Sequence, residues 1–145
     1  MSVYAENKRA HFDYEFLETY EAGLELTGHE TKSIRLGYPN IAGSHVILRG
    51  GEAYLTGMSV PSFQVGNEPS EYDKDRIRRL LLTKKELTEL STKTKAGLTI
   101  IGVKLYNSKR RIKILIALAR GKKKSDKREI IKKRETDREI RRFKK

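Results

Sequence analysis

Cationic and aromatic side chains lie close together near the start of the chain. Asn7, Lys8 and Arg9 precede Phe12 and Tyr14. Lysine and arginine bind phosphate oxygens and flat rings stack on unpaired bases, a combination typical of surfaces that bind single-stranded nucleic acid or RNA loops. A second interpretation, solvated cations beside core aromatics, fits the composition equally well. The five residues are therefore candidate nucleic-acid contacts.

A second basic cluster lies in the middle of the chain. Arg76, Arg78 and Arg79 come just before the apolar run Leu80–Leu82. We expect at least two of these leucines to pack in the core. An exposed leucine beside arginines could instead contact a base.

Residues for catalysis or metal binding do not come together in the sequence. His11, His29 and His45 are scattered, and none has a second ligand at the spacing of a metal site. Asp73 and Asp75 lie beside the arginine cluster, where they balance charge better than they would serve acid–base chemistry. Neither a glycine-rich phosphate loop nor a nucleophile elbow is present. We expect no catalytic residue, no metal and no cofactor.

Positive charge is concentrated at the C-terminus. Residues 120–145 hold 14 of the 32 lysines and arginines but only 5 of the 19 acids of a chain with net charge +13. Such a block favours a polyanionic partner, and its few large apolar residues predict a tail that is disordered until it binds. With no cysteine, no run near 18 apolar residues and no signal-peptide pattern, we expect a cytoplasmic protein that does not span a membrane.

The pattern of the chain before this tail predicts short strands with a few helical turns. The expected elements are a bent strand over 11–26, one or two helical turns over 28–37, a hairpin of strands 45–49 and 52–58 around Gly50-Gly51, an irregular segment 61–73, a helix over 83–97, and strands 98–106 and 111–119. Thr83 and Glu86 have the spacing of a capping box, and Gly97 suits a helix end. The last strand has one apolar face, formed by Ile112, Ile114, Ile116 and Leu118. Five or six strands without a βαβ pattern predict a mainly β fold, a small antiparallel barrel.

Several runs of residues match the motifs of one family in order. They are Asn7–Ala10, Glu18–Leu24, Gly28–Arg35, Arg79–Leu82, and Ala119–Lys123 with Asp126–Arg128. In this order, with the basic tail, they resemble the SsrA-binding protein family, the protein partners of transfer-messenger RNA in bacterial trans-translation. The resemblance covers nearly the whole chain.

This resemblance implies a closed barrel of the oligonucleotide-binding type at residues 1–120 and a tail at 121–145. It implies a non-enzymatic adaptor that binds the tRNA-like domain of transfer-messenger RNA and brings it to ribosomes stalled without a stop codon. The tail is expected to enter the empty mRNA channel of the 70S ribosome near the decoding centre and to become helical there. We expect a monomer.

The resemblance also assigns roles by position. Glu21, Leu81 and Thr83 match positions that matter for RNA binding in relatives, although Thr83 stands where Asn or His is common. The full set of expected RNA-binding residues is Asn7, Lys8, Arg9, Phe12, Tyr14, Glu21, Lys32, Arg35, Arg79, Leu81 and Thr83. The expected ribosome-binding residues of the tail are Gly121, Lys122, Lys123, Asp126, Lys127, Arg128, Arg134, Arg138 and Ile140.

Other functions remain open at this point. Composition alone fits a ribosomal protein or translation factor with a barrel and an rRNA-binding tail. An RNA-processing enzyme would need catalytic residues, which the sequence does not offer. A protein bound to anionic membrane surfaces would need a wide apolar face in the tail.

Overall fold

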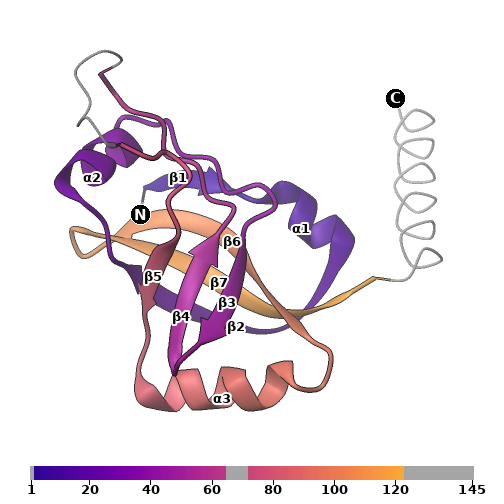
Figure 1. Ribbon diagram of the computed structural model, residues 1–145. Helices are drawn as coiled ribbons and strands as arrows, with labels where there is room; N and C mark the ends of the chain where they lie inside the picture. The colour runs from indigo at the N-terminus through magenta and orange to yellow at the C-terminus, as the bar shows by residue number, and fades with distance from the viewer. Residues whose placement is uncertain (1, 65–71, 123–145) are drawn as a thin grey trace, which may run out of the picture.

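The fold is a small β-barrel with three short helices (Figure 1). The computed structural model describes residues 2–64 and 72–122. Its elements in order are β1 (Val3–Glu6), α1 (Lys8–Asp13), β2 (Tyr14–Leu24), α2 (Gly28–Arg35), β3 (His45–Arg49), β4 (Glu52–Thr56), β5 (Arg78–Leu81), α3 (Lys84–Thr94), β6 (Thr99–Ser108) and β7 (Arg111–Gly121). The prediction of a mainly β fold is confirmed.

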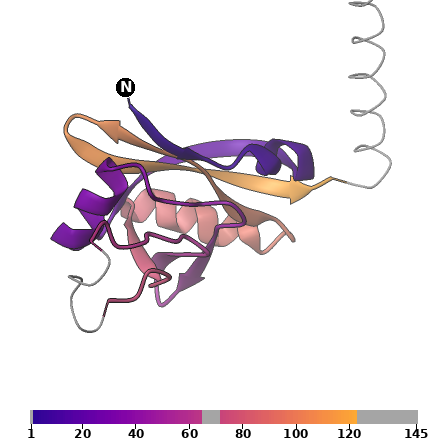
Figure 2. The ribbon, with the colours of Figure 1, turned by 90° about the horizontal axis from the view of Figure 1, so that it is seen from above.

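Antiparallel pairing closes the sheet on itself. The strands follow the order β1-β6-β3-β4-β5-β2-β7, and a further pairing joins β6 to β7. Six strands thus form a ring, and β1 adds to β6 at residues 104–106, beyond the point where β3 pairs at Ile101. Figure 2 shows the long β2, β6 and β7 strands crossing above the short β3–β5 strands. Closure leaves few unpaired strand edges, which agrees with the predicted oligonucleotide-binding type of barrel.

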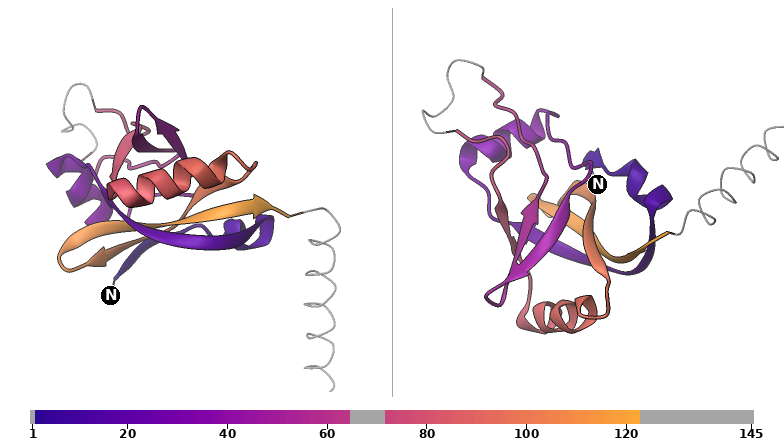
Figure 3. Two further views of the ribbon diagram at one scale, coloured as in Figure 1. Left: turned by 90° about the horizontal axis from the view of Figure 1, so that it is seen from below. Right: turned by 45° about the vertical axis from the view of Figure 1, so that its right-hand side comes forward.

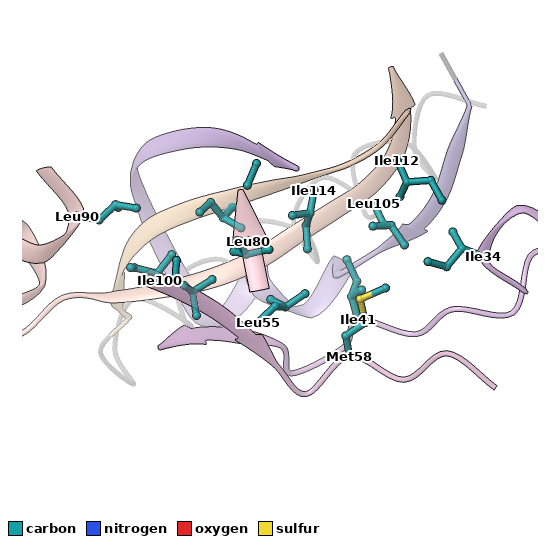
Figure 4. Packing of buried hydrophobic residues seen from close by; sticks show 14 of the residues in the cluster. Ile34, Ile41, Leu55, Met58, Leu80, Leu90, Ile100, Leu105, Ile112 and Ile114 are labelled. Carbon is teal, nitrogen blue, oxygen red and sulfur yellow. The ribbon is translucent and has the colours of Figure 1, made fainter. Parts of the chain in front are cut away.

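The core fills the inside of this ring. The predicted apolar face of β7 is confirmed: Ile112, Ile114, Ile116 and Leu118 are all at most 7% exposed. They pack with side chains from the other strands and with Leu90 of α3 (Figure 4). A smaller cluster outside the barrel joins Ala10 of α1 to alternate residues of β6 and β7. These two clusters anchor α3 and α1 to the sheet.

Tight turns set the register of two hairpins. Gly50 and Gly51 have φ of 58° and 77°, which confirms the predicted turn between β3 and β4. Lys109 and Arg110 also have positive φ, 50° and 66°, although neither is glycine. The β6–β7 turn is therefore two residues long, whereas the sequence predicted four, and both strands extend further than expected.

Three short elements differ from the sequence prediction. The bent strand predicted over 11–26 begins only at Tyr14, because residues 8–13 form α1 and bury Ala10 against the sheet. The strands β1 and β5 were not predicted, because each has only four residues, too few to show the alternation of a strand. In β5, two of the four are arginines. The irregular segment predicted from Pro61 contains no helix or strand in its described part.

Candidate nucleic-acid interface

One group of predicted residues gathers where β2 meets β5. The register pairs Gly23 with Leu81 and Leu24 with Leu80. Leu80 is 1% exposed and lies in the core, while Leu81 points outward and is 47% exposed. Glu21 lies two positions before Gly23 and therefore on the same face of β2. The fold brings Glu21 and Leu81 to one surface.

Glu21 is held by a residue from a distant strand. The hydroxyl of Tyr106 on β6 donates a hydrogen bond to Glu21 Oε2, across the intervening strand β7. Burial and the adjacent Glu21 carboxylate raise the pKa of the Tyr106 hydroxyl above its usual value. The hydroxyl therefore stays protonated and remains a donor at neutral pH.

Arg79 lies on the same outward face, two positions before Leu81. Its Nε is 3.0 Å from Glu25 Oε2, and its terminal nitrogen is 3.9 Å from Glu52 Oε1. The arginine side chain is 43% exposed, and exposed ion pairs contribute little to stability. Arg79 can thus exchange these carboxylates for a phosphate at small cost.

Thr83 starts helix α3 directly after this surface. Its hydroxyl accepts from the Glu86 amide at 3.2 Å, and Glu86 Oε1 accepts from the Thr83 amide at 3.0 Å. The predicted capping box is confirmed. It fixes the direction in which the chain leaves β5 and so positions the exposed Leu81.

A second group lies on α1. Arg9 stacks on the Phe12 ring at 4.7 Å from its centroid and pairs with Asp13 at 3.3 Å. Lys8 is exposed. A groove of about 380 Å³ runs beside α1, with Arg9, Tyr14 and His45 among its lining residues. A cation, an aromatic ring and an imidazole around one groove suit a nucleotide.

Asn7 is buried, although the sequence suggested that it contacts RNA. It is 5% exposed, and its Nδ2 donates to the Gly102 carbonyl at 2.9 Å while its amide donates to the Val103 carbonyl. Its polar groups bind the backbone of β6. Asn7 therefore joins α1 to the sheet and presents no side-chain donor at the surface.

A third group lies on α2. The Lys32 ammonium is 4.8 Å from the Phe63 ring centroid, and Arg35 donates to the Arg110 carbonyl at 3.1 Å. Both cations are exposed. They form a basic edge beside the β6–β7 turn.

A buried ion cluster holds α2 in place. Glu30 is 2% exposed at its side chain, Arg78 is fully buried, and their closest oxygen and nitrogen are 2.6 Å apart. Arg76 lies 2.6 Å from the other Glu30 oxygen. The Arg78 guanidinium also donates to the carbonyls of Met58, Arg76 and Lys74. Lys74 and Arg76 lie just before β5 in the chain, and Met58 lies just after β4, which pairs with β5. Because Glu30 lies on α2, the cluster ties α2 to the strand that carries Arg79.

Opposing effects act on the Glu30 carboxyl. Burial raises its pKa, but hydrogen bonds from Arg76 and the Thr27 amide and the charge of Arg78 outweigh burial, so the pKa lies below its usual 4.5. Glu30 is thus ionised at neutral pH. It also closes a capping box with Thr27, whose hydroxyl accepts from the Glu30 amide at 3.1 Å.

The fold does not merge the three groups into one patch. In Figure 1, α3 and the adjoining end of β5 lie at the bottom of the barrel, whereas α1 and α2 lie at the top on opposite sides. The right-hand view of Figure 3 shows the same separation. Each group can therefore contact a different part of a large partner.

Comparison with known proteins places this chain in a family. A family model described as SmpB protein matches residues 4–145. The SsrA-binding protein of Thermosipho africanus is 49% identical over 97% of this chain and 95% of its own length. That of Nostoc punctiforme is 43% identical over 97% and 91%.

The chain belongs to the SmpB protein family. A solved structure described as "tmRNA-SmpB: a journey to the center of the bacterial ribosome" has a TM-score of 0.67 and 42% identity, covering 82% of this chain and 84% of its own. The resemblance noted from the sequence motifs is confirmed.

The first residues of the expected tail belong to the barrel. Gly121 ends β7 opposite Tyr14, one residue beyond the predicted domain boundary. The Lys122 amide donates to the Asp13 carbonyl, and its ammonium donates to the His11 carbonyl at 2.8 Å. Lys122 is thus anchored to α1, while Gly121 pairs with the first residue of β2. The remaining predicted tail residues lie outside the described part of the chain: Lys123, Asp126, Lys127, Arg128, Arg134, Arg138 and Ile140.

The sequence did not reveal the roles of three residues of this candidate interface and its support, namely Glu30, Arg78 and Tyr106. Glu30 had a usable signal, the Thr27-x-x-Glu30 capping-box spacing. Arg78 had none, because a buried arginine looks like its exposed neighbours in the sequence. Tyr106 meets Glu21 only through the closure of the barrel. Among the described residues, no group of histidines and acids could hold a metal ion, and no helix is long and apolar enough to cross a membrane.

Proposed function

We propose that this chain is an RNA-binding adaptor that binds the tRNA-like domain of transfer-messenger RNA and delivers it to stalled ribosomes for trans-translation. The observation that carries the proposal is the near-full-length match to relatives named SsrA-binding protein, at up to 49% identity. The solved structural neighbour, named for tmRNA and the bacterial ribosome, supports the same assignment.

The barrel binds the folded RNA. Glu21, Arg79 and Leu81 form the principal contact surface, because they share one outward face and combine a carboxylate acceptor, a cation and an exposed apolar side chain. Thr83 flanks this surface at the start of α3. The α1 and α2 groups supply cations for further phosphates, with Lys8, Arg9, Lys32 and Arg35 exposed. Asn7 acts indirectly, by fixing α1.

The tail binds the ribosome. Residues 123–145 carry most of the excess positive charge, and a vacant mRNA channel lined by RNA offers phosphates to it. A message that still fills the channel excludes the tail, so an unoccupied channel signals stalling. The adaptor acts as a monomer in the cytoplasm and performs no chemistry itself.

Sequencing the RNA that co-purifies with the protein from its native cell tests this function. We expect transfer-messenger RNA enriched over rRNA. Binding of the isolated tRNA-like domain should weaken steeply with salt, with a log–log slope of about −0.7 to −0.9 per neutralised phosphate. Enrichment of rRNA alone would instead identify a ribosomal component.

A further inference from the structure

The contact between Tyr106 and Glu21 does more than fill space on the barrel. Tyr106 is 5% exposed, lies between β1 and β7 on β6, and directs its hydroxyl to Glu21 Oε2. Glu21 itself is exposed. A buried donor thus fixes an exposed carboxylate, which lowers the entropy lost when that carboxylate binds a ligand.

The fixed carboxylate accepts hydrogen bonds only. Tyr106 uses one acceptor position of Oε2, and within residues 2–64 and 72–122 no other group binds Glu21. Oε1 and the remaining position on Oε2 are therefore open to two donors side by side. Phosphates and base acceptors are repelled by the negative charge, so the ligand must present hydrogen-bond donors, which on the base edges are N–H groups.

Guanine fits this arrangement among the four RNA bases. Its Watson–Crick edge carries two adjacent donors, N1–H and the N2 amino group, whose spacing matches the two oxygens of one carboxylate. Adenine, cytosine and uracil each place a single donor group beside an acceptor on that edge. In RNA, side chains read this edge only where the base is unpaired.

The neighbouring side chains suit the rest of such a nucleotide. A Cβ built on Gly23 would lie 3.2 Å from Leu81 Cβ and 3.6 Å from the Lys113 ammonium nitrogen. Leu81, which is 47% exposed, can pack against a base face, and Lys113 can bind a phosphate. The absence of a side chain at Gly23 lets Leu81 and Lys113 approach this closely.

We propose that Glu21, held in position by Tyr106, selects an unpaired guanine of the bound RNA. The proposal rests on the proposed function and names the base that this surface recognises. Tyr106 is the positioning residue, and Glu21 is the residue that contacts the base.

Inosine interference mapping of the tRNA-like domain with the unaltered protein tests the guanine. Inosine keeps N1–H but lacks the N2 amino group. We expect substitution at one unpaired guanine to reduce binding, and we expect this interference to disappear with Glu21→Ala. If inosine at every unpaired guanine is tolerated while Glu21→Ala still weakens binding, guanine selection is overturned and the proposed function stands. If the unaltered protein does not bind the RNA, the proposed function itself fails.

A double-mutant cycle tests the positioning role. Tyr106→Phe keeps the ring and removes the donor, and we expect about 2- to 10-fold weaker binding, as for one lost hydrogen bond. In the Glu21→Ala background the same change should have no further effect. Tyr20→Phe is the control, because it also removes tyrosine–glutamate hydrogen bonds, here to Glu18 of β2 and Glu89 of α3, together with a bond from Lys93, on the face of β2 opposite Glu21. Unchanged binding by Tyr106→Phe, or equal loss in both backgrounds, would overturn the positioning role.

Discussion

At the scale of single residues, neighbouring arginines have opposite roles. Arg78 is fully buried against Glu30, while Arg79 is 43% exposed beside Glu25. Strand alternation explains the difference, because consecutive side chains point to opposite faces. The sequence shows only a basic cluster, so the side that each arginine takes could not be predicted without the register of β5.

This alternation predicts different effects of two equivalent substitutions. Arg78→Ala leaves Glu30 charged and buried, and we expect it to lower the free energy of unfolding by about 3–5 kcal/mol. Arg79→Ala removes an exposed pair and should cost no more than about 1 kcal/mol, while weakening RNA binding. Urea unfolding and RNA titration of both variants measure these effects. Similar stability losses for the two would contradict the assignment.

Glu30 makes stability depend on pH. Its pKa is lower in the folded protein than the usual 4.5, so the folded state binds fewer protons than the unfolded state in this range. Its contribution is therefore complete above about pH 4.5 and is lost as pH falls through the folded pKa. We expect the difference in unfolding free energy between the unaltered protein and Glu30→Gln to be large at pH 7 and to shrink below pH 4.5. A difference that stays constant across this range would show that ionisation of Glu30 is not responsible.

At the scale of elements, the hairpins show what sequence patterns reveal. Gly50-Gly51 between alternating strands was readable, because glycine adopts positive φ at little cost. Lys109 and Arg110 adopt the same backbone without that signal, so the length of the β6–β7 turn was missed. The capping box at Thr83 was predicted for the same reason as the glycine turn: its residue types suit one local geometry. Elements set by distant contacts, such as β1 on β6, carried no such signal.

The strained β6–β7 turn can be relieved. Arg110 has φ of 66°, and a non-glycine residue in this region costs roughly 1–2 kcal/mol. We expect Arg110→Gly to raise the free energy of unfolding by up to about 1 kcal/mol, since the unfolded chain also gains freedom. The bond from Arg35 uses the Arg110 carbonyl and survives the change. Gly51→Ala in the β3–β4 turn is the reciprocal variant and should destabilise. Thermal unfolding of both variants measures the effect, and a loss of stability in Arg110→Gly would contradict it.

At the scale of the whole molecule, the proposed function divides the work between the barrel and the basic tail. The charge asymmetry and the strand pattern predicted both parts from the sequence, and the barrel class is confirmed. Of the expected RNA-binding residues, Glu21, Arg79 and Leu81 share one outward face and Thr83 directly follows it, while the α1 and α2 residues lie elsewhere and Asn7 is buried. Their contacts with RNA stay predictions. Long-range closure decides which residues share a face, and spacing along the chain does not encode it.

This division predicts separable losses of function. A chain that ends at Lys122 keeps every described strand and the anchoring bonds of Lys122 to α1, so it should retain most of its affinity for the tRNA-like domain. It should nevertheless fail to support tagging on stalled ribosomes, because the positive charge proposed to occupy the mRNA channel is gone. Glu21→Ala provides the opposite case: it keeps the tail but should bind the isolated RNA at least about 10-fold more weakly. RNA titration and a reconstituted tagging assay, run on both variants, distinguish the two roles. If truncation at Lys122 abolished RNA binding, or left tagging at its full rate, the barrel and the tail could not be independent binding parts.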